Sequence, residues 1–258
     1  MNSFIIPPAM NRTDLLKQLP DHLRARFPTI PAADWSALGM LALASGAACG
    51  LWLLRVLLKE RLHHAFLPWN LFLAWLPLLF ALLALHFGQR TGWRSWPAWL
   101  AAGAWLLFFP NAPYLFTDLT HLDPARDHRF WMDLIMILLF AWPAFLVGCL
   151  SLKLLHAPVA ERFGIIRGWL FVGGVCGLAG VGVYLGRFLR WNSWDILANP
   201  LGLALDLLAF LGHPPTHPAY RFSLLFGLLL FIGYALHYAG AHATTTHRSE
   251  GSRSPAQA

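Results

Sequence analysis

The sequence predicts an all-α integral membrane protein, a bundle of about six transmembrane helices. Of its 258 residues, 57% are hydrophobic and only 12% are charged, against roughly 25% charged residues in an ordinary soluble domain. Charged residues are also sparse through the long stretch between the two tails. Backbone amides in hydrocarbon must bond within their own segment, so each apolar run is expected to be a helix. This composition argues against an ordinary soluble enzyme.

Six uncharged runs reach the length of about 20 residues that a hydrocarbon core about 30 Å thick requires. They are Trp35 to Leu54, Ala65 to Phe87, Ser95 to Thr117, Leu134 to Leu152, Gly168 to Gly186 and Phe222 to Ala241. Tryptophans cluster near the ends of these runs, where the indole ring prefers the headgroup zone. We therefore expect a polar N-terminal tail over 1–34, a membrane helical domain over 35–241 and a disordered C-terminal tail over 242–258.

The third run is predicted to be a helix broken at Pro110-Pro113. The prolines stop one helix, and Asn111 as N-cap with Pro113 in the first turn can start another. Polar residues then share one face of the second piece at helical spacing: Tyr114, Thr117, Asp118 and His121. Such a face could line a cavity in a transporter or an embedded enzyme. The alternative is a kinked helix end whose polar face meets interfacial water.

The fourth run follows Asp133, where a carboxylate favours the positive end of the helix dipole. The fifth run is a packing helix, because Gly173, Gly177 and Gly180 share a face that allows a neighbouring helix to approach closely. Gly182 and Gly186 repeat the same spacing. This pattern predicts that Gly177→Leu disrupts folding.

A polar segment from Gly186 to Asp195 follows the packing helix and contains Arg187 and Arg190 about one turn apart. The arginines and tryptophans there could simply reach the headgroups and complement the helix dipole. Alternatively, the two guanidinium groups hold a phosphate or a carboxylate. Residues 195–211 are predicted to form an interfacial or re-entrant helix, interrupted by Pro200, with Asp206 in solvent.

The six-helix topology places the loops 55–68, 109–133 and 187–221 on one side, so their polar residues can converge on one pocket. The candidate catalytic residues are Asp118, His121 and Asp133. The candidate ligand-binding residues are Asn111, Tyr114, Arg187, Arg190, Trp191, Asn192 and Asp195, with Asn70 beside them. Opposite charges near hydrocarbon are expensive to leave unpaired, which predicts an ion pair between Asp118 and Arg187 or Arg190. Asp118 and His121 would need a third ligand such as Asp133 to bind a metal, and no metal site is assigned.

A net charge of +7 does not indicate nucleic-acid binding, because the basic residues are scattered beside apolar runs. Such residues are expected to contact anionic lipid headgroups, so membrane lipids are the expected partners. Cys49, Cys149 and Cys176 lie within apolar runs and indicate core positions rather than disulfides. A slight excess of Lys and Arg on the N-terminal side favours a cytoplasmic N-terminus.

Three segments carry a resemblance to a known family: Trp69 to Trp75, Phe109 to Leu122, and Gly186 to Asp195. In this order they resemble the bacterial multi-pass membrane family catalogued as domain of unknown function 1361, over roughly residues 40 to 240. The resemblance implies a protein of the bacterial inner membrane and supplies no activity or cofactor.

The leading hypothesis is a membrane protein of unknown activity with a pocket for a polar or anionic ligand, such as an anionic lipid or a lipid-linked molecule, at one membrane face. In one alternative the protein is an enzyme acting on a lipid-linked or phosphorylated substrate, with Asp118 or His121 in acid–base chemistry. In others it is a small-solute transporter that uses the broken helix, or a membrane assembly factor.

Overall fold

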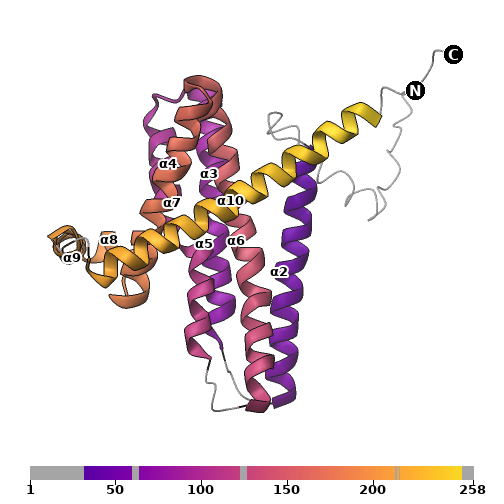
Figure 1. Ribbon diagram of the computed structural model, residues 1–258, viewed down its shortest axis with the longest axis vertical. Coiled ribbons are helices and arrows are strands. Elements are labelled where there is room, and N and C mark those ends of the chain that lie inside the picture. The colour runs from indigo at the N-terminus through magenta and orange to yellow at the C-terminus, as the bar shows by residue number, and fades with distance from the viewer. Residues whose placement is uncertain (1–31, 60–63, 123–126, 213, 215, 252–258) are drawn as a thin grey trace, which may run out of the picture.

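A computed structural model describes residues 32–59, 64–122, 127–212, 214 and 216–251. All the regular elements in these ranges are helical. In chain order they are α2 (Ala32–Lys59), α3 (Phe66–Thr91), α4 (Trp96–Phe108), α5 (Asn111–Tyr114), the 3-10 helix η1 (Leu115–His121), α6 (Asp127–Phe163), α7 (Ile165–Phe188), α8 (Asp195–Ala198), α9 (Pro200–Gly212) and α10 (Pro218–Gly251). Figure 1 shows α2, α3 and α6 running alongside one another while α10 crosses the bundle obliquely.

The prediction of a multi-pass helical membrane protein is confirmed. Within the described ranges, five helices are long and apolar enough to cross a bilayer on their own: α2, α3, α6, α7 and α10. The predicted third crossing is instead divided among α4, α5 and η1. At 1.5 Å per α-helical residue and 2.0 Å per 3-10 residue, these three pieces together rise about 40 Å, about as much as α3.

The break between α4 and α5 lies at the predicted prolines, but its cap differs from the prediction. Asn111 is not an N-cap, because Phe109 and Pro110 both keep helical dihedral angles and no extended residue precedes α5. The Asn111 amide instead donates a 2.9 Å hydrogen bond back to the carbonyl of Phe108. The chain therefore bends at this point without leaving helical geometry.

Glycines of two neighbouring helices make room for the break. A Cβ on Gly148 of α6 would lie 2.8 Å from the Cβ of Ala112, and one on Gly182 of α7 would lie 2.6 Å from Cγ of Pro110. Both distances are shorter than side chains tolerate, and Ala112 is fully buried. The break is thus packed tightly between α6 and α7.

The first helix is joined to α6 by an ion pair at each end. Lys153 Nζ lies 2.5 Å from Asp34 Oδ1, and Arg55 pairs with Asp133. The two charged positions on α2 are separated by about 30 Å of helix at 1.5 Å per residue. Asp133 lies near the start of α6, where the helix dipole favours a carboxylate, and it also neutralises Arg55 of α2.

The last crossing contacts α7 at glycines. A Cβ on Gly180 would lie 2.1 Å from the carbonyl oxygen of Ser223, and one on Gly227 would lie 2.9 Å from the carbonyl oxygen of Cys176. A Cβ on Gly173 or Gly177 would meet no atom within 4 Å. The predicted close approach of helices is therefore present at Gly180 and at the backbone of Gly177, whose Cα lies 3.2 Å from the Cβ position of Gly227, and the prediction was wrong for Gly173.

Residues 195–211 form α8 and α9, and α9, at 13 residues, is too short to cross a bilayer, as predicted. The predicted interruption at Pro200 is present: α8 ends at Ala198, and Pro200 begins α9, because proline is favoured in the first turn. Helix α10 continues to Gly251, so 242–251 are helical rather than disordered, and no proline interrupts them. Residues 252–258 and most of the N-terminal tail lie outside the described residues.

Candidate functional site

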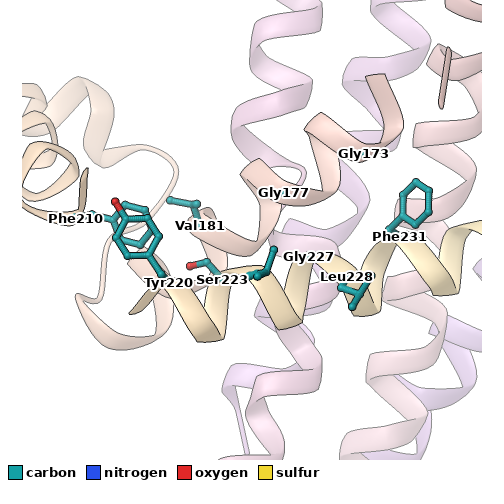
Figure 2. A pocket seen from close by; sticks show the side chains of 10 residues that line it. Gly173, Gly177, Val181, Phe210, Tyr220, Ser223, Gly227, Leu228 and Phe231 are labelled. Carbon is teal, nitrogen blue, oxygen red and sulfur yellow. The ribbon is translucent and has the colours of Figure 1, made fainter. Parts of the chain in front are cut away.

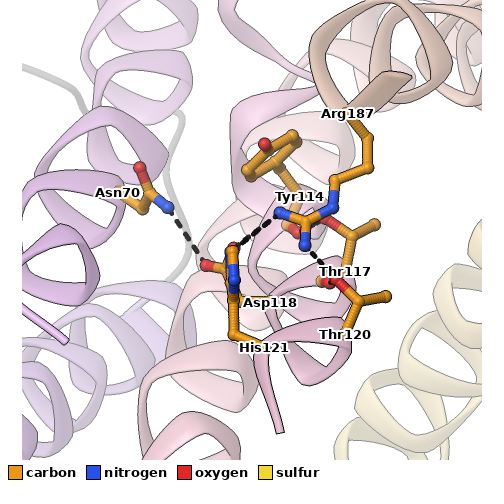
Figure 3. A network of polar contacts seen from close by, with 7 residues as sticks. All are labelled: Asn70, Tyr114, Thr117, Asp118, Thr120, His121 and Arg187. Atoms are coloured by element: carbon orange, nitrogen blue, oxygen red, sulfur yellow. Dashed lines mark hydrogen bonds and ion pairs between the residues drawn. The ribbon is translucent and has the colours of Figure 1, made fainter. Parts of the chain in front are cut away.

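The polar site is built around the carboxylate of Asp118, whose side chain is 1% exposed. Asn70, in the first turns of α3, donates from Nδ2 to Asp118 Oδ2 at 3.0 Å. Arg187, in the last turn of α7, donates from Nη1 to Asp118 Oδ1 at 3.4 Å. Figure 3 shows these three side chains converging from three elements. The predicted ion pair between Asp118 and Arg187 is thus confirmed.

Arg187 also contacts the last turn of η1. Its Nη1 lies 3.2 Å from Nε2 of His121, and its Nη2 donates to Oγ1 of Thr120. A guanidinium group can only donate hydrogen bonds, so His121 Nε2 must accept and its proton must lie on Nδ1. The geometry therefore holds His121 as a neutral imidazole.

The site therefore combines a buried carboxylate, a guanidinium group and a neutral imidazole.

The 3-10 geometry of η1 decides which side chains reach Arg187. Oγ1 of Thr117 bonds to the Tyr114 carbonyl at 2.7 Å, and Oγ1 of Thr120 bonds to the Thr117 carbonyl at 2.8 Å. Three residues per turn align positions 114, 117 and 120, whereas the predicted α-helical stripe omitted Thr120. Thr120 was missed for this reason.

A second set of contacts joins the break to the segment after α7. Asn111 Nδ2 donates to Ser193 Oγ at 2.9 Å, and Ser193 Oγ donates to the Leu107 carbonyl at 3.2 Å. Gly186 lies against Tyr114: a Cβ on Gly186 would make ordinary contact with the ring at 3.4 Å. The predicted contact between the 111–121 and 187–195 blocks is thus confirmed. No sequence signal distinguished Ser193 from its polar neighbours.

The other predicted site residues have partners or positions outside this network. Trp191 Nε1 donates to Asp206 Oδ2 at 2.7 Å, so Asp206 is half-buried and bonded rather than solvated as predicted. The backbone N–H and side chain of Asn192 donate to Asp195 Oδ2 at 2.7 and 3.3 Å, a local turn at the start of α8. Arg190 is exposed and has a left-handed backbone with φ of 62°.

The described residues contain no group of three His, Cys, Asp or Glu side chains that could hold a metal ion. Asp118 and His121 are both held by Arg187, while Asp133 pairs with Arg55. The structure therefore does not assemble the metal ligand set that combines Asp118 and His121 with Asp133.

The family model described as "Protein of unknown function (DUF1361)" matches residues 69–232, more than half of the chain. The chain belongs to this family. No curated protein and no solved structure matches it. The DUF1361 match includes Asn70, all of η1 and Arg187, so the whole Asp118 network lies in the family region. It excludes α2, and with it the ion pairs that join α2 to α6.

Proposed function

We propose that this membrane protein binds a phosphate-bearing ligand, such as an anionic lipid headgroup or a lipid-linked molecule, through Arg187. The proposal rests on which N–H groups of the Arg187 guanidinium already have partners in the protein. Nη1 is engaged by Asp118 and His121, and Nη2 by Thr120. Among the described residues, no acceptor contacts Nε or uses the second Nη2 hydrogen. That edge of a guanidinium is suited to bidentate contact with a phosphate.

The Arg187 side chain is also preorganised for such a ligand. Its contact with the buried Asp118 carboxylate fixes the guanidinium at a side-chain exposure of 16%. Arg190 lies three residues further on, exposed, and adds a second cation. Trp69 precedes Asn70 in the sequence, and Trp194 follows Arg190 by four residues. Their ring centroids are 6.4 Å apart, as expected for tryptophans of the headgroup zone. These features favour an anionic group at the membrane face.

A second candidate, an enzyme acting on a lipid-linked or phosphorylated substrate, is favoured by His121. This neutral imidazole is 47% exposed and directly beside Arg187. A phosphate that drew Arg187 toward itself would free Nε2 of His121 to act as a general base. The transporter alternative gains less support, since the break at Pro110-Pro113 is packed against α6 and α7 by Gly148 and Gly182.

The binding proposal is tested with Arg190→Gln, which leaves the Asp118 network intact. We expect this change to weaken binding of phosphatidylglycerol at the Arg187 site of the purified protein about tenfold, the loss of one charge-assisted contact. Native mass spectrometry measures the bound lipid, and inorganic phosphate as competitor separates a headgroup site from a free-phosphate site. Arg94→Gln, an exposed arginine beyond the other end of α3, is the matched control. Equal losses in both variants would refute the proposal.

We further propose that the protein resides in a bacterial inner membrane with its N-terminus in the cytoplasm, based on the distribution of Lys and Arg. This orientation places the Asp118 network on the periplasmic side. A periplasm-dependent reporter should then be inactive when fused after Arg94 and active when fused after Asp123. The opposite pattern would reverse the orientation.

A further inference from the structure

A second feature of the molecule is an apolar groove of about 380 Å³ between α7 and α10. Figure 2 shows Gly173 and Gly177 along one wall, Ser223 and Phe231 along the other, and Phe210 of α9 at one end. Both walls belong to helices that can span a bilayer. The medium that meets this groove is therefore lipid rather than water.

The groove lies where two glycines on α7 turn their Cβ positions away from α10. The helices are in contact at Gly180 and Gly227, where a Cβ would lie 3.0 Å or less from backbone atoms of the other helix. Cβ atoms at Gly173 and Gly177 would point into open space. The missing side chains leave a channel along one side of the helix crossing.

A buried hydroxyl group in this groove indicates a polar acceptor in whatever fills it. Ser223 is 5% exposed, and its Oγ has no hydrogen-bond partner among the described residues. Figure 2 places this hydroxyl among the groove-lining side chains. An unsatisfied hydroxyl in an apolar medium costs about 1–3 kcal/mol in proteins. The ester carbonyl of a lipid is an acceptor that would remove this cost.

A cation lies at the same end of the groove. Arg221 is exposed and stands three and seven residues before Leu224 and Leu228, which line the groove. Residues at this spacing share a helix face. Tyr220, whose hydroxyl donates to the Leu211 carbonyl at 3.1 Å, joins α10 to α9 at this end. The groove thus offers an apolar channel, then a hydroxyl donor, then a positive charge.

We propose that this groove binds one acyl chain of an anionic glycerophospholipid. The chain lies along Gly173 and Gly177, the ester carbonyl accepts from Ser223, and the phosphate lies against Arg221. The order of the three features matches the order of tail, ester and phosphate in such a lipid. This lipid site is independent of the Asp118 network, because it shares no residue with it.

The test uses Gly177→Leu in the purified full-length protein after removal of lipid. The new side chain fills the groove, so the affinity for the phosphatidylglycerol molecule bound there should fall at least tenfold in native mass spectrometry, while a second phosphatidylglycerol, bound at Arg187, should be unaffected. Gly174→Leu is the matched control, since Gly174 also has no neighbour within 4 Å but does not line the groove.

Arg221→Gln should remove the preference for phosphatidylglycerol over phosphatidylcholine of the same acyl chains. Ser223→Ala should weaken the binding of both lipids to the groove several-fold.

Three results would overturn the lipid site. Unchanged phosphatidylglycerol binding in Gly177→Leu would do so, as would equal losses in Gly177→Leu and Gly174→Leu. A change from dimer to monomer caused by Gly177→Leu would assign the groove to a second copy of the chain instead. Arg190→Gln should leave binding in this groove unchanged, which separates it from the ligand proposed at Arg187.

Discussion

Replacing Gly180 with leucine should abolish folded protein. A Cβ at this position would lie 2.1 Å from the Ser223 carbonyl oxygen and 3.0 Å from the Gly227 amide nitrogen. Both are backbone atoms of α10, so the clash is relieved only by separating α7 from α10. Even Gly180→Ala should lower the free energy of unfolding by about 3 kcal/mol, the upper end of the range that is typical of overpacking. The yield of monodisperse protein and the thermal unfolding midpoint in detergent measure the effect.

The matched control is Gly177→Leu, one turn earlier on the same helix. Its Cβ would meet no atom within 4 Å, so this variant should fold with nearly normal yield. This expectation reverses the one from sequence, which predicted that Gly177→Leu disrupts folding. If both variants fail to fold equally, α7 and α10 do not meet as described.

The second large effect is expected for Arg187→Gln. This change leaves the carboxylate of Asp118, which is 1% exposed, without its cation. Removal of one partner from a buried ion pair typically destabilises a protein by about 3–5 kcal/mol. Asp118→Asn should cost less, about 1 kcal/mol, because it removes the buried charge and loses only part of a hydrogen-bond set.

The double variant Asp118→Asn with Arg187→Gln should recover much of the stability lost in Arg187→Gln alone. Unfolding in detergent measures all three variants. Losses that simply add would show that the two side chains do not interact.

Local chemistry predicted much of the fold and part of the site. Long apolar runs require helices in a bilayer whatever their neighbours are, and prolines such as Pro110 remove backbone donors wherever they stand. The pairing of Asp118 with Arg187 followed from the cost of an unpaired charge near hydrocarbon. These inferences depend on the solvent and on the residue itself, both of which composition and spacing reveal.

The sequence by itself therefore determined the membrane class, the broken third crossing and the central ion pair of this protein. Only the tertiary structure decided that a side chain at Gly180 would meet the backbone of α10 while one at Gly177 would enter a groove, since both glycines lie on the same helix face. It likewise decided that Thr120 reaches Arg187 and that Asp133 is paired with Arg55. The physical reason is that helical periodicity specifies which residues share a face, whereas the crossing of two helices specifies which atoms meet that face.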